Sequence, residues 1–426
     1  MRLRESIRRA WVPTVEGPIP SLEPPKDRDE GQIADFTIFD AKGSERPSWL
    51  DADIKRKKGG AATGDAAVDG AYESIKKSLV FYLMGLGINS LDAQGMAIKA
   101  AVHIGKDFNN AFYVDGKIHF GDGDGKIFHN FAEDLTVVAH ELGHGIVELV
   151  LGGLTYWSQS GALNEAIVDI LGVSALQFAL GQQADENASW LVGELAMVPY
   201  TDQAGKLIHP ALRSMKAPGT AYVNHPQIGT DPQPPSMDKL YTGPRDNYGV
   251  HINSGIINRA FYLTQTALAP KGMSPEIVTK IFLEAVKTLN KNTTFKEFAG
   301  ATLEIAWNLY YQKNPEIHEA LTKAWNTVKV LGEGAIDNNP PAFEITSPEV
   351  AESMGIDLRT YAKLQIRLTH SDLSDKPGVK KFDVGFVLDR DGKASLVVMA
   401  YVGSEQTTPE LPEKFEGYKV VQMTAA

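Results

Sequence analysis

A short helical stretch with two histidines constrains this chain more than any other feature. Near the centre of residues 132–169 the sequence reads His140-Glu141-Leu142-Gly143-His144, which is the pattern H-E-x-x-H. Residues four apart share one face of an α-helix, because each turn takes 3.6 residues. His140 and His144 can therefore hold one tetrahedral metal ion, and Glu141 lies beside them as a candidate general base.

The surroundings of this motif distinguish it from a chance match on a solvated helix. Its flanks are apolar, and a mostly buried helix does not carry three ionisable groups unless they are paired or bind a ligand. Catalytic zinc sites use three protein ligands and keep one position open. Glu165, in a second helical pattern, supplies the third ligand. Asp169 lies one turn further along the same face, where its carboxylate can accept the outer N–H of a ligating histidine.

Composition narrows the class of protein and the kind of metal site. The 426 residues suffice for two or three domains, and the net charge of −11 argues against a nucleic-acid partner. The chain has no cysteine, so a zinc site must use histidine and carboxylate ligands. No apolar run reaches the roughly 18 residues of a transmembrane helix, so we expect no membrane partner. No apolar stretch follows the basic N-terminus as it does in a Sec signal peptide.

The two helical motifs together resemble a known family. H-E-L-G-H followed by Gly161-Ala162-Leu163-Asn164-Glu165-Ala166 and Asp169 is similar to the thermolysin family of zinc metalloendopeptidases, and the resemblance covers about residues 35–335. It implies one zinc ion on His140, His144 and Glu165, with water activated for attack on a peptide carbonyl and Glu141 taking its proton. Asn164 and Asp169 would orient the ligating histidines.

A second motif implies the groups that stabilise the oxyanion. Residues 246–256 read D-N-Y-G-V-H-I-N-S-G-I and resemble the family's D-x-x-x-V-H-x-N-S-G-I. The match implies that His251, oriented by Asp246, and Tyr156 act on the developing negative charge. Arg213 stands in a segment, A-L-R-S-M, that matches the family's own and implies a contact with the substrate carbonyl.

The resemblance also implies how a peptide binds. Residues 109–113 read N-N-A-F-Y and are similar to the family's edge strand, where backbone groups at Asn110 and Ala111 would pair with an extended substrate. Val137, Val192 and Leu212 fall where the family lines its specificity pocket. We therefore expect cleavage of proteins and peptides before bulky apolar residues.

One departure from the family concerns calcium. Better-known members hold two calcium ions in an acidic cluster, whereas the matching positions here include Thr136, Leu176 and Leu191. Only Glu194 and Asp185 remain acidic. The sequence therefore predicts zinc alone, without a double calcium site.

The expected fold is an α+β, two-lobed, thermolysin-like peptidase with a small β-rich module. An N-terminal α/β lobe spans residues 35–152, a helical lobe spans 153–335, and the module spans 336–426. Residues 1–34, rich in proline and acidic residues, read as a disordered tail or a short prosegment of a zymogen.

Hydrophobic periodicity and capping residues predict the individual elements. We expect the zinc helix to start near Asn130 with a capping box to Glu133, and the next helix to start after Ser160. His103, at the end of a predicted strand, is expected to be structural. Further helices are predicted at 65–84, 275–289, 294–311 and 315–331, with caps at Ser274, at Thr293 or Thr294, and at Asn314, and strands at 343–345, 364–368, 382–388 and 396–402.

Two alternatives stay open at this point. One is a glutamate-zinc aminopeptidase, although no G-x-M-E-N type amine anchor is visible. The other is a self-inhibited or partner-binding protein that acts through residues 336–426, with residues 1–34 or that module as an intramolecular inhibitor. Members of the resembled family are mostly secreted, and the export route here is open.

Overall fold

The computed structural model describes residues 30–332 and, beyond them, parts of a C-terminal sheet. The N-terminal lobe is built on a five-stranded sheet in the order β2-β1-β3-β5-β4. Its strands are β1 Phe36–Asp40, β2 Ile54–Lys57, β3 Ile98–Ile104, β4 Ala111–Val114 and β5 Lys117–Gly121. The central strand β3 runs parallel to β1 and β5, whereas β2 and β4 pair antiparallel at the two edges. Among the described strands, β4 therefore keeps one free edge.

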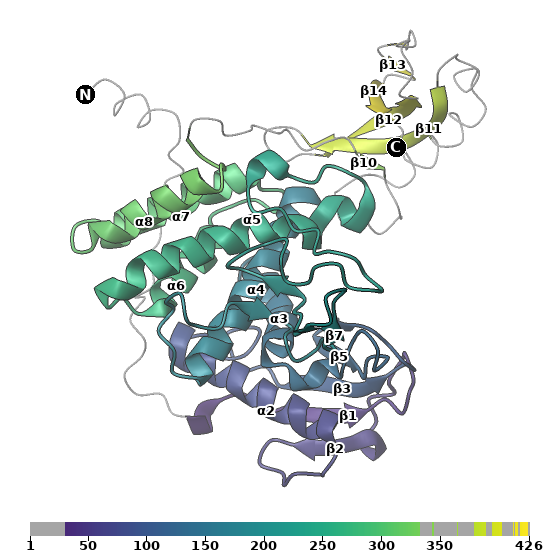
Figure 1. The fold of residues 1–426 in the computed structure, drawn as a ribbon, viewed down its shortest axis with the longest axis vertical. Helices are drawn as coiled ribbons and strands as arrows, with labels where there is room; N and C mark the ends of the chain where they lie inside the picture. The colour runs from purple at the N-terminus through teal and green to yellow at the C-terminus, as the bar shows by residue number, and fades with distance from the viewer. Residues whose placement is uncertain are drawn as a thin grey trace.

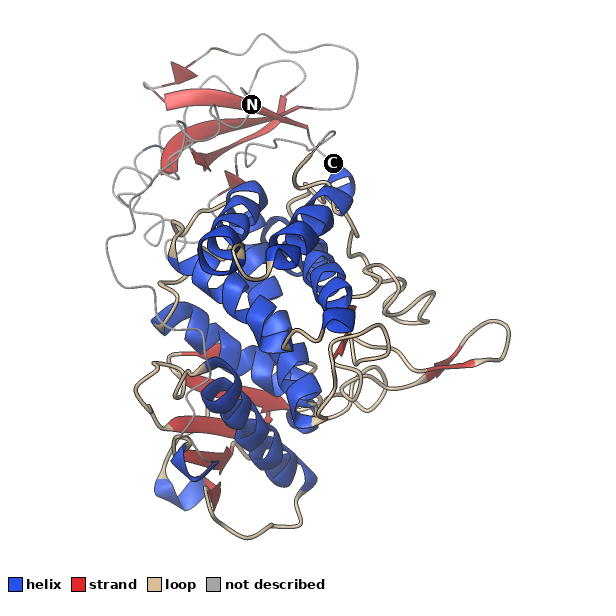
Figure 2. Ribbon diagram, turned by 90° about the vertical axis from the view of Figure 1, so that its left-hand side faces the viewer, coloured by secondary structure: helices blue, strands red, loops and turns tan. Residues whose placement is uncertain are grey.

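Helices cover this sheet and form most of the second lobe (Figures 1 and 2). The helices are α2 Ala66–Val80, α3 Leu135–Leu149, α4 Ser158–Ala179, α5 Arg245–Leu268, α6 Pro275–Lys287, α7 Phe295–Tyr310 and α8 Pro315–Thr327. One hydrophobic core runs from the sheet through α3 and α4 into the helical lobe. The α+β, two-lobed architecture predicted from the sequence is confirmed.

The helices α3 and α4 approach each other closely because two glycines allow it. A Cβ atom on Gly143 of α3 would lie 3.0 Å from the Val168 side chain, and one on Gly172 of α4 would lie 2.5 Å from the carbonyl oxygen of Thr136. Any larger side chain at Gly172 would push the helices apart. These contacts set the distance between the two helices that carry the predicted metal ligands.

The helix α4 is buried on nearly every side. By length and composition it could cross a membrane, yet 83% of its most apolar window lies inside the protein. It packs between α3 and α5, which makes it the central helix of the core (Figure 1). A helix buried on nearly every side has no solvated polar face, and the polar residues of α4 that belong to the predicted site, Asn164, Glu165 and Asp169, are themselves buried.

The observed helix starts correct several predicted caps. The helix α3 begins at Leu135, and its cap is Asp134, whose carboxylate accepts the N–H groups of Thr136 and Val137. Asn130 instead caps the short 3-10 turn Phe131–Glu133. The helix α4 begins at Ser158, before the predicted Ser160 cap, and the Ser160 hydroxyl bonds backward to the carbonyls of Thr155 and Trp157.

Of the caps predicted for α6, α7 and α8, only that of α7 forms a side-chain bond to the helix backbone. Thr294 and Glu297 form the reciprocal capping box of α7, which confirms the predicted start of that helix. Ser274 and Asn314 precede α6 and α8 without a side-chain cap bond, and the Ser274 hydroxyl instead donates to the Glu276 carboxylate. The helix predicted at 65–84 continues from α2 into the π-helical turn Phe81–Leu86.

A charged histidine joins three parts of the N-terminal lobe. His103, near the end of β3, lies between Asp65, the cap of α2, and Asp122 in the loop before α3. Its Nε2 is 3.1 Å from Asp65, and its Nδ1 is 2.8 Å from Asp122. The bond to Asp122 outweighs burial and, with Asp65, raises the pKa of His103 to about 9. The predicted structural role of His103 is confirmed by these contacts.

The C-terminal module contains a second five-stranded sheet in the order β10-β11-β12-β14-β13. Its strands are β10 Phe343–Glu344, β11 Val379–Leu388, β12 Ala394–Val402, β13 Lys414–Phe415 and β14 Tyr418–Thr424. The sequence did not predict β13 or β14. Leu364 is helical, which contradicts the strand predicted at 364–368. Residues 1–29 and the hairpin turn at 389–392 lie outside the described residues.

Candidate active site

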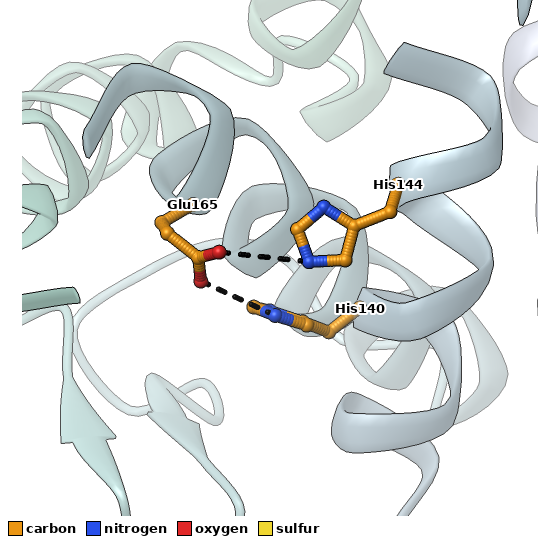
Figure 3. Close-up of side chains that lie close together, drawn as sticks. All are labelled: His140, His144 and Glu165. Carbon is orange, nitrogen blue, oxygen red and sulfur yellow. Dashed lines mark ion pairs between the residues drawn. The ribbon is translucent and has the colours of Figure 1, made fainter. Parts of the chain in front are cut away.

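Three predicted metal ligands meet between α3 and α4 (Figure 3). The Nε2 atom of His140 lies 3.4 Å from Oε2 of Glu165, and Nε2 of His144 lies 3.6 Å from Oε1 of the same carboxylate. One ligand atom from each side chain lies within 4.8 Å of the other two. Within the described residues this is the one group of three or more histidine or acidic side chains with that geometry.

The donor set fits a zinc ion on three independent grounds. Tetrahedral zinc with bonds of about 2.0–2.1 Å places its ligand atoms roughly 3.4 Å apart, close to the separations found here. The outer nitrogens of His140 and His144 are engaged by Asp169 (2.8 Å) and by Oδ1 of Asn164 (3.0 Å), so the inner Nε2 atoms are the ones directed at the site. Glu165 is fully buried, and its Oε2 has no hydrogen-bond partner, which suits a cation ligand.

Asp169 lies behind the metal ligands and connects His140, Arg213 and Asn258 through hydrogen bonds. Its buried carboxylate accepts hydrogen bonds from His140, from Nε and a terminal nitrogen of Arg213 at 2.7 and 2.6 Å, and from Asn258 at 2.8 Å. Burial raises the pKa of Asp169, but Arg213 and His140 outweigh it and hold that pKa at about 2. Asp169 is therefore an anion at any ordinary pH and fixes both the tautomer and the orientation of His140.

Protons and metal compete for His140. Burial lowers the pKa of this imidazole, but its hydrogen bond to Asp169 and its ion pair with Glu165 prevail and raise the pKa to about 10. The same cluster lowers the pKa of Glu165 well below its ordinary value, against the effect of burial. Metal binding to His140 must therefore release a proton, and the affinity must fall as the pH falls.

His251 faces the metal ligands from α5. Residues 246–249 at the start of this helix adopt left-handed backbone angles, with φ between 47° and 83°. This turn folds the Asp246 carboxylate back onto His251, where it accepts the backbone N–H at 2.8 Å and bonds the ring Nδ1 at 2.6 Å. Burial lowers the pKa of His251, but Glu165 and Asp246 outweigh it and raise that pKa.

Tyr156 lies between His251 and the ligand carboxylate. Its hydroxyl donates to Oε1 of Glu165 at 2.5 Å and lies 3.1 Å from Nε2 of His251. Burial, together with the charge of Glu165, raises the pKa of Tyr156. The phenol therefore stays protonated and can serve as a hydrogen-bond donor.

These groups line one cleft of about 880 Å³. Its floor is α3, with Glu141 and the metal ligands at the centre, and Asn110 and Ala111 at the start of β4 form one wall. Val137 and Leu212 line the cleft as predicted. Val192 does not line it, because this side chain is fully buried in β6 (Leu191–Val192), and its carbonyl accepts the N–H of Leu212 at 2.9 Å.

Sequence reasoning missed two buried amides that support the site. Asn258 holds Asp169, and its place two helical turns after His251 on α5 is the signal that could have identified it. Gln233 donates from Nε2 to the His251 carbonyl at 2.7 Å and to the Ser254 hydroxyl at 2.9 Å. It lies in a proline-rich loop with no periodic pattern, so nothing in the sequence indicated this contact.

Comparisons with known proteins agree with this geometry. The family model described as thermolysin metallopeptidase, catalytic domain, matches residues 27–148, and the one described as thermolysin metallopeptidase, alpha-helical domain, matches residues 152–330. Protease PrtS of Photorhabdus sp. (strain Az29) is 40% identical over 298 residues, which is 69% of this chain and 76% of the relative. An extracellular metalloprotease of Pectobacterium carotovorum subsp. carotovorum is 41% identical over 313 residues, 73% of this chain and 85% of the relative. Among solved structures, the precursor of protealysin, a metalloproteinase from Serratia proteamaculans, is 37% identical with a TM-score of 0.62, covering 72% of this chain and 90% of that chain.

Proposed function

Because this chain belongs to the thermolysin family of metallopeptidases and is a zinc-dependent endopeptidase, we propose which residues carry out the reaction and which peptides are cleaved. His140, His144 and Glu165 hold the zinc ion. The observation that supports this assignment is the buried Glu165 carboxylate, whose Oε2 lies 3.4 Å from Nε2 of His140 without a hydrogen bond and whose Oε1 lies 3.6 Å from Nε2 of His144. Asp169 and Asn164 each engage the outer ring nitrogen of one histidine, so the inner nitrogens face the site and bind the ion as His140 gives up its proton.

The side chains around the metal ligands have separate roles in proton transfer and in stabilising the oxyanion. A bound zinc ion supplies Lewis-acid chemistry, which lowers the pKa of water and polarises the peptide carbonyl. Glu141 accepts the proton from the attacking water and passes it to the leaving amine. Tyr156 and His251 donate hydrogen bonds to the oxyanion, with Asp246 orienting the imidazole. Loss of one such donor typically lowers kcat by about 10²–10³-fold.

Arg213 acts from the other side of the cleft. Its guanidinium is paired with Asp169 and also lines the cleft, so it can donate a further hydrogen bond to a substrate carbonyl. The free edge of β4 at Asn110 and Ala111 offers backbone groups to an extended peptide. Val137 and Leu212 bind a bulky apolar side chain on the residue that becomes the new N-terminus, and Val192 supports Leu212 from behind.

We infer that zinc is the only structural or catalytic metal of this domain. Thr136, at the position where relatives have an acidic residue, is satisfied by protein groups: its hydroxyl donates to Asp134 at 2.5 Å and accepts the N–H of Gly193 at 2.8 Å. Within the described residues, Asp185 and Glu194 belong to no cluster of three metal-ligating side chains.

Secretion and activation are proposed from the relatives. One relative is named an extracellular metalloprotease, and one similar structure is that of a precursor, so we propose an exported enzyme made as a zymogen. Residues 1–34 are the proposed prosegment, with residues 336–426 as the second candidate for intramolecular inhibition. N-terminal sequencing of the active enzyme tests the first assignment, since an N-terminus still at residue 1 would refute it.

The test of the catalytic assignment compares the wild type with Glu141→Gln. We expect the variant to retain zinc, measured by elemental mass spectrometry, and to lose about 10²–10⁴-fold in kcat on an internally quenched peptide. Glu304→Gln, an exposed change on α7, is the matched control and should behave like the wild type. Unchanged turnover in Glu141→Gln would refute the role of Glu141. Release of single N-terminal residues without internal cleavage would favour the aminopeptidase alternative.

A further inference from the structure

The two ends of the cleft differ in chemistry. Val137 lies one turn before His140, and Glu148 lies one turn after His144, so they flank the metal ligands at positions about 16 Å apart along α3. Around Val137 the cleft is lined by Phe131 and Leu212. At the Glu148 end its lining includes a lysine, Lys291, and Gly153. One end is therefore apolar, and the other carries charge.

The backbone of Lys291 is held in a fixed place. This residue lies between α6 and α7, and its carbonyl accepts the N–H of Thr155 at 2.8 Å. The Thr155 hydroxyl donates to Oδ1 of Asn292 at 2.6 Å, which makes a second tie to the same loop. Thr155 directly precedes Tyr156, so Lys291 is anchored one residue away from a proposed oxyanion donor.

The side chain of Lys291 extends over a glycine into the cleft. A Cβ atom built on Gly153 would lie 3.9 Å from Nζ of Lys291, so the ammonium group rests above this residue. Gly153 has φ +78°, a conformation that favours glycine and keeps this surface free of a side chain. The ammonium group therefore has open space on the cleft side.

The ammonium group of Lys291 is available to a ligand because the described residues offer it no ion-pair partner. Within the described residues, no carboxylate lies within ion-pair distance of its Nζ. The nearby acid, Glu148, is hydrogen-bonded to the hydroxyl of Tyr113 on β4, and burial together with this carboxylate raises the pKa of Tyr113. The anion at this end of the cleft thus already has a partner, whereas the cation does not.

We propose that Lys291 makes this enzyme prefer substrates with an acidic side chain two or three residues before the scissile bond. The inference rests on the proposed function, in which the apolar end takes the residue that follows the cleaved bond. An extended peptide rises about 3.3 Å per residue. Along α3, Glu148 at the charged end lies roughly 8 Å in axial rise from the midpoint between the two histidines, and an extended peptide that follows the helix covers this rise in two or three residues.

The solvent exposure of Lys291 determines how strongly the enzyme should prefer acidic substrates. Lys291 is exposed, so an ion pair with a bound carboxylate is partly screened by water. Exposed pairs of this kind change affinity by about two- to fivefold. The preference should appear in kcat/KM and should shrink as salt rises to about 0.5 M, because the Debye length then falls to a few ångströms.

The experiment uses the full chain and three quenched peptides that differ only in Glu, Gln or Lys at the second and third residues before the scissile bond. We expect the wild type to cleave the Glu peptide about two- to fivefold faster than the Lys peptide in kcat/KM. Lys291→Met should remove this ratio, and Lys291→Glu should invert it. Lys313→Met is the matched control for the loss of one positive charge. Lys313 is an exposed lysine that follows the C-terminal end of α7, whereas Lys291 precedes its N-terminal end.

The outcomes separate this proposal from the proposed function. A wild-type ratio near one, or an equal ratio in Lys291→Met, overturns the role of Lys291 while cleavage of the Gln peptide still supports an endopeptidase. A wild-type preference for the Lys peptide also overturns it and assigns this end of the cleft to Glu148. If the wild type cleaves none of the three peptides, the proposed function fails and this inference fails with it.

Discussion

Replacement of His103 by glutamine should make the enzyme less stable in a pH-dependent way. The imidazole lies between Asp65 and Asp122, and these carboxylates raise its pKa from 6.5 to about 9 in the folded protein. A group with a raised folded pKa contributes stability that is fully present below its unfolded pKa. That contribution is lost as the pH rises through the folded pKa. The relevant window for His103 is therefore pH 6.5 to about 9.

The magnitude follows from the rise of this pKa from 6.5 to about 9. At 1.36 kcal/mol per unit this corresponds to about 3.4 kcal/mol. The histidine side chain is 28% exposed and both aspartates are more than 40% exposed, so solvent screening reduces this figure. We expect His103→Gln to lower the free energy of unfolding by about 2 kcal/mol at pH 6, and by a much smaller, constant amount above pH 9.5.

The assay is urea unfolding followed by tryptophan fluorescence at pH 6, 7.5 and 9.5 with saturating zinc. Both proteins should carry Glu141→Gln, so that self-digestion does not distort the transition. His209→Gln, at an exposed histidine with no such pair of carboxylates, is the matched control and should show no pH-dependent difference. A loss of stability in His103→Gln that is equal at all three pH values, or that grows with pH, would refute the reasoning.

Two further predictions concern the metals. Asp169→Asn should weaken zinc binding by about 10- to 100-fold, measured by chelator competition, because it removes the carboxylate that fixes the His140 tautomer and leaves the Arg213 guanidinium without its counter-charge. Asp185→Asn is the control. A threefold or smaller change in Asp169→Asn would contradict the role of Asp169 in orienting His140. A calcium-selective chelator should leave the melting temperature of the wild type unchanged, because Thr136 already has protein partners; a decrease of more than about 5 °C would reveal a calcium site.

The metal site was predictable because it depends on spacing within helices. Four-residue spacing places His140 and His144 on one face of α3, and Glu165 and Asp169 on one face of α4. The observed contacts between these side chains agree with that spacing. The sequence could not show how closely the two helices approach. That distance depends on Gly143 and Gly172, each of which meets atoms of the partner helix.

The helix starts and the supporting contacts were harder to predict because several residues compete for each role. Asp134 and Asn130 can both cap a helix, and the structure uses Asp134 for α3 and Asn130 for the turn before it. Gln233 supports His251 across the tertiary fold, and Val192 lies behind Leu212, and neither arrangement has a local sequence signal. In the C-terminal module, the short strand β13 offered too few residues for an alternating pattern.

If the unpaired edge of β4 binds the substrate as proposed, it should also decide which proteins can become substrates. An edge strand can pair with a visiting chain only where that chain has main-chain N–H and C=O groups to spare, and these groups are already occupied within the helices and sheets of a folded protein. Susceptibility to this enzyme should therefore follow local unfolding in the target more closely than its sequence. The same reasoning applies to the enzyme itself, whose working lifetime is then limited by how often its own loops open far enough to enter a neighbouring molecule's cleft.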